Sequence, residues 1–243
     1  MLGITYMHDS STPNFTRFGN YMNRFMCDTF IGWKSNKNID KQTKTLYTCH
    51  PHGIIPCSTF HFLAKGIPVV VATIMLKSVL GPFPLKFHGF IDNKRETIIK
   101  NVENYGSVAL YPGGSDELCL VTGDRKKFNI YLRTGFIRLA IEKEYSIIPV
   151  LVPAEEEAYT PFLTGCWRFK HKMWESFGIS LGMHHGRYWL MTVPKKMEDP
   201  CIYYGEPIKC NITDTVDTIK DRYVEELNRL AEEAGVEINV VYA

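Results

Sequence analysis

The stretch TLYTCHPHG at residues 45–53 is the part of the chain that decides the expected fold, because a β-favouring run ends there in a turn. Three further apolar runs have the same continuous character: residues 68–73, 107–111 and 146–152. Strands without a polar face are typical of sheets that helices cover on both sides. Helix-like segments lie between these runs, at residues 53–64, 94–104 and 128–141. The alternation predicts an α/β fold with a mostly parallel central sheet flanked by helices.

The two ends of the chain add helices to this core. The apolar positions in residues 216–234 recur at helical spacing, with Thr213 placed to cap the start and Gly235 to end the helix. Residues 14–30 also have helical spacing and precede a polar linker. Residues 188–193 and 201–204 are expected to add edge strands. We therefore expect an N-terminal helix and linker over residues 1–44, followed by one domain over residues 45–243 that is large enough to be an enzyme.

The composition excludes several classes of protein. The 243 residues carry a net charge of +2 and are 45% hydrophobic, which is ordinary for a globular chain and does not indicate a nucleic-acid binder. Seven cysteines, an odd number without a CxxC pair, favour a reducing, intracellular compartment. The chain shows none of the GxSxG, GxxxxGK[ST], GxGxxG and HExxH motifs. Serine-hydrolase, nucleotide-hydrolase, Rossmann and zincin functions are therefore disfavoured.

The N-terminal helix has an unusually aromatic stripe, made of Phe15, Phe18, Met22, Phe25, Met26 and Phe30. Such a stripe either packs against the domain or inserts into the acyl boundary of a bilayer. The longest apolar stretch, Ile67 to Leu76, has only ten residues, whereas a spanning helix needs about 20. No secretory signal is recognisable at the front. If the protein meets a membrane, we expect it to lie on the surface.

The first motif with chemistry is His50-Pro51-His52-Gly53, which follows the expected strand at residues 45–49. Open α/β sheets place ligands at such strand ends. Proline fixes the turn, glycine allows a close approach of backbone or substrate, and a histidine can act as a general base near neutral pH. The same pair could instead hold a metal together with His61 or His88, or be structural.

The second motif, residues 111–117 (YPGGSDE), follows the strand at residues 107–111. Gly113 and Gly114 could present backbone N–H groups to a phosphate or an oxyanion, although a plain tight turn has the same composition. Asp116 and Glu117 could orient a histidine of the first motif. A third motif, RTGF at residues 133–136, opens a helical segment whose Arg133 could meet an anion. Residues 164–197 are basic and rich in aromatics, which suits an anionic ligand or a lipid headgroup region.

Taken together, these pieces resemble the type 2 diacylglycerol acyltransferase family, which includes monoacylglycerol and wax-alcohol acyltransferases. The matching text is HPHG at residues 50–53, GFIDNKRETIIKNVENYGSVALYPGGSDE from Gly89, and RTGFIRLAIEKEYSIIPVLVPAEE from Arg133. HHGRYW from His184 and YGEPIKC from Tyr204 continue the similarity. Members usually carry hydrophobic segments before HPHG, which have no counterpart here. We therefore expect peripheral attachment to a cytoplasm-facing membrane, the endoplasmic reticulum or a lipid droplet in a eukaryote.

The resemblance implies transfer of a fatty acyl group from acyl-CoA, as co-substrate, to the hydroxyl of a neutral lipid, with diacylglycerol favoured and no cofactor or metal. It implies His52 as the general base, Glu117 as the acid that orients it, and His50 as a further catalytic contact. The substrate-binding residues that it implies come from the same motifs: Pro51, Gly53, Gly113, Gly114, Arg133, Gly135, Phe136 and Arg187. Arg168, Lys170 and Lys172 are further possible contacts for CoA phosphates. A hydrolase or metalloenzyme that uses the His-x-His pair, and a non-catalytic lipid-binding relative, stay open as alternatives.

Overall fold

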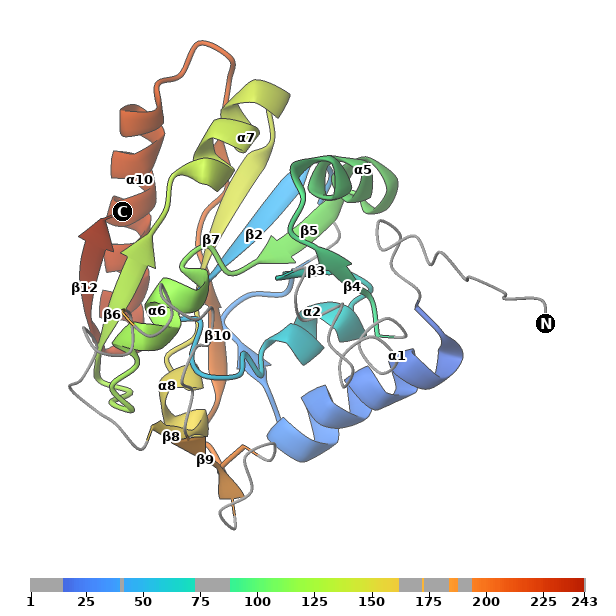
Figure 1. The fold of residues 1–243 in the computed structure, drawn as a ribbon, viewed down its shortest axis with the longest axis vertical. Helices are drawn as coiled ribbons and strands as arrows, with labels where there is room; N and C mark the ends of the chain where they lie inside the picture. The colour runs from blue at the N-terminus through green and yellow to red at the C-terminus, as the bar shows by residue number, and fades with distance from the viewer. Residues whose placement is uncertain are drawn as a thin grey trace.

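A central sheet organises the chain in the computed structural model, which describes residues 15–39, 42–72, 88–161, 172, 184–187 and 194–242. The sheet has eight strands in the order β1-β10-β7-β2-β5-β3-β4, with β11 also paired to β7 (Figure 1). The strands are β1 (Lys34–Ser35), β2 (Thr45–His50), β3 (Val69–Val71), β4 (Phe90–Asp92), β5 (Ser107–Leu110), β7 (Ser146–Leu151), β10 (Cys201–Tyr204) and β11 (Ile208–Lys209). The pairs within β7-β2-β5-β3-β4 are parallel, whereas β10 and β11 run antiparallel to β7. The predicted mostly parallel α/β fold is confirmed.

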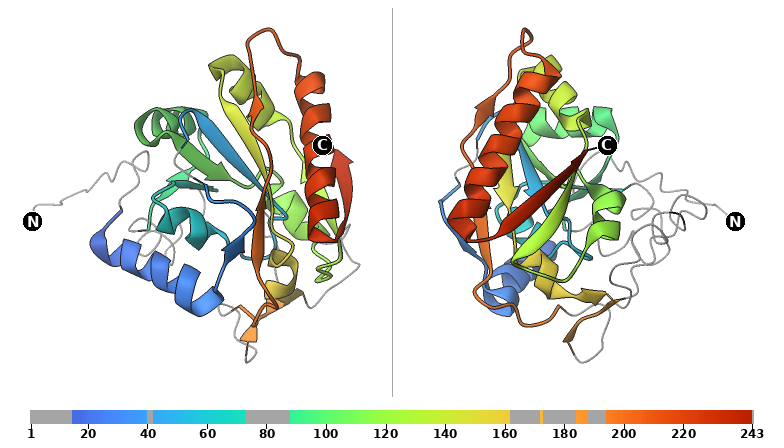
Figure 2. Two further views of the ribbon diagram at one scale, coloured as in Figure 1. Left: turned by 180° about the vertical axis from the view of Figure 1, so that it is seen from behind. Right: turned by 90° about the vertical axis from the view of Figure 1, so that its left-hand side faces the viewer.

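Alternate residues of β2 enter two separate cores, one on each face of the sheet. Tyr47 and Cys49 belong to the core on one face, and Leu46 belongs to the core on the other. Helix α2 (Thr59–Ala64) contributes Phe62 and Leu63 to the first core. The helices α5 (Arg95–Tyr105), α7 (Gly135–Lys143) and α10 (Val216–Ala234) contribute to the second core. Figure 2 shows α10 on one side of the sheet and α1 and α2 on the other. This double cover explains why the strands lack a polar face.

Two of the helical segments expected from the sequence are shorter than predicted. The helix expected over residues 53–64 begins at Thr59, because Gly53 has a left-handed φ of 61° and Pro56 lacks an N–H group. The first half of the segment expected over residues 128–141 is strand β6 (Lys127–Leu132). Phe128, Ile130 and Leu132 are buried in alternation along it, and β6 pairs in parallel with β12 (Glu237–Tyr242) in a second small sheet. Only Gly135 to Lys143 is helical.

The N-terminal helix forms, but its aromatic stripe does not lie on one buried face. Helix α1 (Arg17–Arg24) is capped by the Thr16 side chain and continues as a π-helical segment, Phe25–Ile31. Phe18 is 69% exposed, whereas the buried positions of α1 are Gly19 and Asn23. The predicted amphipathic helix is therefore present, but Phe18 and Phe25 do not pack against the domain, and insertion of the stripe into a bilayer stays a prediction.

The C-terminal helix follows its predicted course with a different cap. Thr215, not Thr213, caps α10 by accepting a hydrogen bond from the Thr218 N–H group. Gly235 ends the helix at a φ of 67°, as predicted. Strand β10 lies between β1 and β7 instead of at an edge, because the short β1 pairs with its outer side. The strand expected at residues 188–193 lies outside the described residues.

The apolar stretch Ile67 to Leu76 contains strand β3, and its residues from 73 onward lie outside the described part of the chain. Among the residues that the structure describes, no helix combines the length and the apolar character that crossing a bilayer requires. The expected boundary at residue 44 stays a prediction, although β1 joins residues 34–35 to the central sheet.

Candidate active site

The HPHG and PGG motifs meet at the carboxyl end of the central sheet. His50 is the last residue of β2, which pairs in parallel with β5 on one side and β7 on the other. Helix α6 (Gly114–Leu120) follows β5, and α8 (Glu155–Ala158) follows β7 (Figure 1). The segments that follow these three adjacent strands therefore meet at the carboxyl edge of the sheet, which is where open α/β sheets bind ligands.

His50 and Glu117 form a buried pair across this junction. The His50 Nδ1 atom lies 3.0 Å from Glu117 Oε1 and 3.1 Å from Oε2. His50 is 0% exposed and Glu117 is 1% exposed. Because a carboxylate can only accept, Nδ1 carries a hydrogen, and in the neutral form of the ring Nε2 then has the lone pair. Nε2 is buried and has no hydrogen-bond partner among the described residues, as is also true of His61 Nε2. His50 differs from His61 in having a carboxylate on its other ring nitrogen, which is the arrangement of a general base.

His52 lies next to this pair but has a different partner. Its Nδ1 atom lies 3.0 Å from the carbonyl oxygen of Gly53, so Nδ1 donates and Nε2 keeps the lone pair. The ring meets Tyr111 edge-on, with 5.6 Å between the ring centroids. Burial lowers the pKa of His52 below its usual value, which favours the neutral ring at pH 7. The expectation that Glu117 orients His52 is therefore wrong: the strand end turns His50 toward the carboxylate, and a backbone carbonyl orients His52.

The two glycines of the PGG motif differ in what they do. A Cβ atom on Gly113 would collide with the Glu117 carboxylate and lie 2.5 Å from Glu117 Cβ, so the bare backbone makes room for the acid. Gly114 has a φ of 53° and donates its N–H group to the Tyr111 carbonyl oxygen at 3.2 Å. The Gly114 amide is thus engaged in the turn, and Gly113 is the glycine that shapes the acid pair.

Alanine at Gly113 is expected to displace Glu117 from His50. Overpacking of a buried position costs about 1–3 kcal/mol, and urea unfolding should show a loss of this size. The control is Gly135→Ala, at a helical position where an added Cβ meets nothing within 4 Å; alanine there should leave stability unchanged or raise it by up to about 1 kcal/mol. Equal stability of the two variants would contradict the close packing at Gly113.

The RTGF motif lies beside the pair and mostly supports it. Arg133 pairs with Asp116 and lies over the Tyr131 ring, 5.8 Å from its centroid. Phe136 is buried against Tyr223, with 5.2 Å between the ring centroids, and Tyr223 lies edge-on to His50 at 6.2 Å. Arg133 is thus near the site with a partner in place, whereas Phe136 packs behind the histidine.

The other histidines named with the motif do not join it. His61 Nδ1 lies 3.7 Å from Cys27 Sγ, and His88 Nδ1 lies 2.8 Å from Asn23 Oδ1. Among the described residues, no group of three or more His, Cys, Asp or Glu side chains is placed to hold a metal ion.

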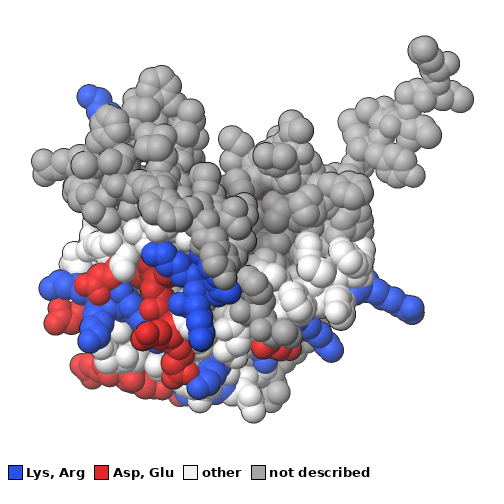
Figure 3. All heavy atoms as spheres, turned by 90° about the horizontal axis from the view of Figure 1, so that it is seen from below, with Lys and Arg blue, Asp and Glu red and all other residues white. Residues whose placement is uncertain are grey.

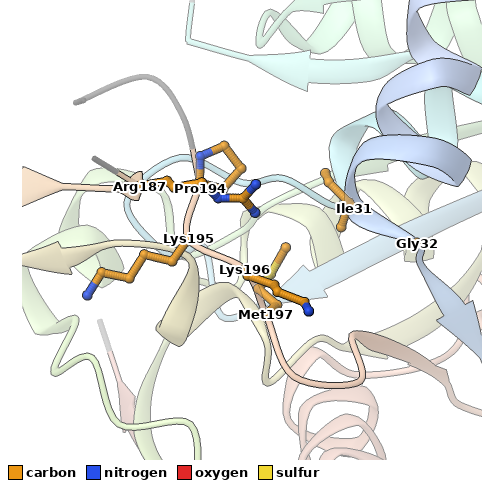
Figure 4. A pocket seen from close by; sticks show the side chains of 7 residues that line it. All are labelled: Ile31, Gly32, Arg187, Pro194, Lys195, Lys196 and Met197. Carbon is orange, nitrogen blue, oxygen red and sulfur yellow. The ribbon is translucent and has the colours of Figure 1, made fainter. Parts of the chain in front are cut away.

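A small cavity with three cationic side chains in its lining lies between residues 31–32 and residues 187 and 194–197. Its volume is about 300 Å³ and it is lined by Ile31, Gly32, Arg187, Pro194, Lys195, Lys196 and Met197. Figure 4 shows the Arg187 and Lys196 side chains extending toward Ile31, whereas Lys195 extends the other way, where its Nζ atom contacts Thr160 Oγ1. Figure 3 shows Lys and Arg mixed with Asp and Glu on the lower face of the molecule. Lys172 is exposed and does not line this cavity, and Arg168 and Lys170 lie outside the described residues.

Glu155 is a buried acid that the sequence reasoning did not select. It is 1% exposed and its carboxylate accepts N–H groups of the loop that follows HPHG. In the sequence, three consecutive glutamates at residues 155–157 follow the apolar strand expected at residues 146–152, and this pattern could have indicated a functional acid at the end of that strand.

Comparisons with known proteins identify related acyltransferases. Yeast diacylglycerol O-acyltransferase 1 is 25% identical in an alignment 232 positions long that covers 82% of this chain and 56% of the relative. Mouse and human 2-acylglycerol O-acyltransferase 1 are 22% and 24% identical over 81% of this chain and 67% of theirs. The chain thus spans between half and two thirds of these relatives.

The fold has a similar counterpart among solved structures. The crystal structure of PlsC, the 1-acyl-sn-glycerophosphate acyltransferase of Thermotoga maritima, aligns with a TM-score of 0.54 and 12% identity over 90% of this chain and 78% of that one. The family described as diacylglycerol acyltransferase matches residues 9–241, almost the whole sequence. The chain therefore belongs to the diacylglycerol acyltransferase family.

Proposed function

We propose that this chain is an O-acyltransferase that moves a fatty acyl group from acyl-CoA to the hydroxyl of a neutral lipid, with diacylglycerol as the favoured acceptor. The observation that carries the proposal is the buried His50–Glu117 pair with an unpartnered Nε2 atom. Family membership supports chemistry on glycerolipids.

In the proposed mechanism His50 Nε2 accepts the proton of the acceptor hydroxyl while the hydroxyl oxygen attacks the thioester carbonyl. The tetrahedral oxyanion then collapses, the C–S bond breaks, and the proton passes from Nε2 to the CoA thiolate. Glu117 holds the tautomer that leaves Nε2 basic and stabilises the imidazolium that forms. Burial of the pair excludes bulk water, which limits hydrolysis of the acyl donor.

His52 is proposed as the substrate-facing histidine of the site. Its side chain is half-buried, whereas His50 is fully buried. The Gly53 carbonyl fixes its tautomer, and the lowered pKa keeps it neutral. A neutral imidazole with a fixed tautomer can accept a hydrogen bond from the acceptor hydroxyl and orient it.

Arg187 and Lys196 are proposed to meet the phosphates of acyl-CoA, because both line the cationic cavity. Replacing both with glutamine should raise KM for acyl-CoA roughly tenfold at low salt, and the difference should shrink as salt screens the charges. Lys143→Gln with Lys209→Gln removes two positive charges elsewhere and should leave KM unchanged. An equal rise in the control, or a rise that salt does not affect, would contradict a phosphate site.

The outward face of the N-terminal helix is proposed to dock on a lipid surface. Phe18, Tyr21 and Phe25 are 69%, 66% and 39% exposed, and Arg17 and Arg24 are exposed beside them. Asn23 instead faces inward, where its Nδ2 atom donates to the His88 carbonyl oxygen at 3.0 Å. Aromatic rings flanked by arginines suit the boundary between acyl chains and phosphate headgroups.

Serine at Phe18, Tyr21 and Phe25 together is expected to weaken binding to anionic phospholipid vesicles by at least about tenfold, because each buried aromatic ring contributes roughly 1.5–3 kcal/mol. Co-sedimentation with vesicles measures the bound fraction. The matched control is Ile212→Ser with Tyr242→Ser, which removes two other exposed apolar side chains. Equal losses in both variants would show that binding is not specific to this face.

The activity itself is tested by incubating the purified protein with labelled acyl-CoA and separate acceptors: diacylglycerol, monoacylglycerol and a long-chain alcohol. Lipid chromatography identifies the product. Labelled triacylglycerol is the expected result. Labelled free fatty acid alone would indicate a hydrolase, and no product with any acceptor would indicate a non-catalytic lipid-binding protein; either result would overturn the proposal.

A further inference from the structure

Glu155 joins the end of β7 to the loop that carries the HPHG motif. Its Oε2 atom accepts the Cys57 N–H group at 2.8 Å, and its Oε1 atom accepts the Ser58 N–H group at 2.6 Å. Each oxygen therefore holds a different backbone donor. Glu155 is 97 positions from Ser58 in sequence, so the contact is tertiary and closes the loop against the neighbouring strand.

The main chain of Glu155 also supports the start of the same loop. A Cβ atom on Gly53 would lie 3.0 Å from the Glu155 carbonyl oxygen and 3.1 Å from Glu155 Cβ. Gly53 thus packs directly on Glu155, and its carbonyl oxygen is the atom that orients His52. One residue therefore holds both ends of the loop over residues 53–58.

A side-chain route leads from the same loop back to His52. Ser58 Oγ lies 2.7 Å from the Tyr111 hydroxyl oxygen, and the Tyr111 ring meets the His52 ring edge-on. The same serine donates its backbone N–H group to Glu155 Oε1. His52 is therefore held on one side by Gly53 and on the other by Tyr111, and both contacts depend on Glu155.

We propose that Glu155 is a positioning residue, which sets the orientation of the His52 imidazole through the loop over residues 53–58 and through Tyr111. The expected effect of Glu155 on turnover rests on the proposed acyl transfer, but its effect on the orientation of His52 does not. The geometric part concerns His52 itself and can be measured without turnover.

The neighbouring residue Glu156 offers a matched control. It is as buried as Glu155, and its Oε2 atom accepts the Thr122 and Gly123 N–H groups, both at 3.1 Å. Burial raises the pKa of both carboxyls to about 7, against the lowering effect of these hydrogen bonds. The two glutamates therefore share burial, donor type and pKa, but Glu156 holds the loop after α6 and not the HPHG loop.

Glutamine at Glu155 keeps the size of the side chain but replaces one acceptor with an NH₂ group, so one backbone N–H group loses its partner. In the purified full-length protein, the pKa of His52 can be measured by NMR titration of its ring signals, which are assigned with His52→Gln. In Glu155→Gln this pKa should rise toward its usual value, because a loosened loop exposes the ring and burial is the main cause of the lowering. Glu155→Asp, which keeps two acceptor oxygens, should restore part of the difference. Tyr111→Phe, which removes only the hydroxyl, should shift the titration in the same direction. His50 and Glu117, which also act on His52 electrostatically, are unchanged in all of these variants.

Turnover provides the second measurement. Because a misplaced group near the reacting atoms can cost about 10²-fold, Glu155→Gln should lower kcat by about that factor with KM for acyl-CoA nearly unchanged. Glu156→Gln should lose similar thermal stability, yet leave the His52 titration unchanged and kcat within about threefold. The proposal is overturned if the His52 titration is the same in Glu155→Gln and Tyr111→Phe as in wild type, or if Glu156→Gln moves it equally. If the wild-type protein shows no acyl transfer, the proposed function is refuted instead, and the His52 titration would still decide the role of Glu155.

Discussion

Replacing His50 with glutamine is expected to lower kcat by about 10³-fold, within the roughly 10²–10⁴-fold range that general base catalysis supplies. Glutamine fills much of the imidazole volume but offers no basic nitrogen at the Nε2 position. The folded state should persist, which circular dichroism and thermal unfolding can confirm. Release of CoA in the presence of diacylglycerol measures the rate.

The control for this change is His61→Gln, which also replaces a buried histidine. Burial lowers the pKa of His61 to about 4, and its ring contacts Cys27 instead of an acid. This variant should lose stability but keep kcat within a few-fold. If His52→Gln abolishes turnover while His50→Gln retains most of it, the proton acceptor is His52, and Glu117 serves only the structure around His50.

Glutamine at Glu117 is expected to lower kcat by about 10²–10⁴-fold with little effect on KM, by the same argument that applies to the acid of a catalytic triad. The amide NH₂ group can donate to His50 Nδ1, which forces the hydrogen onto Nε2 and removes the lone pair that accepts the proton. Aspartate at this position keeps the acceptor and should retain more activity than glutamine.

Glu156→Gln is a suitable comparison for this second change as well, because it removes a buried carboxylate that does not contact a histidine. Stability should fall in both variants, but only Glu117→Gln should abolish turnover. If Glu117→Gln and Glu156→Gln lose activity equally, the loss comes from burying an amide at either position. That result would contradict the acid–base role of the His50–Glu117 pair.

Continuous apolar character was sufficient to predict the main strands. β2, β5 and β7 begin at the predicted residues, because strands that are buried on both faces leave a local signal. Strand β6 was predicted as helix although Phe128, Ile130 and Leu132 alternate with more polar residues. Its partner β12 lies about 110 residues further along the chain, and a pairing over that distance leaves no mark in the local pattern.

The candidate site divides in the same way. HPHG and PGG were placed correctly after β2 and β5, because strand ends and turn residues are local features. Which histidine faces Glu117 was predicted wrongly, since His50 still follows the alternation of β2 whereas His52 lies beyond the strand. Glu155 was not selected, because its role depends on donors in another loop.

The sequence by itself determined the α/β class, the two motifs and the family resemblance, since these depend on residue type, order and spacing along the chain. Only the tertiary structure decided that Glu117 contacts His50, that Gly53 orients His52, and that Phe18 faces outward while Asn23 faces inward. The physical reason is that these features depend on the direction in which each side chain leaves its strand or helix. That direction is set by packing against segments that are distant in the sequence, as in the His50–Glu117 and Asn23–His88 contacts, whose partners are 67 and 65 positions apart.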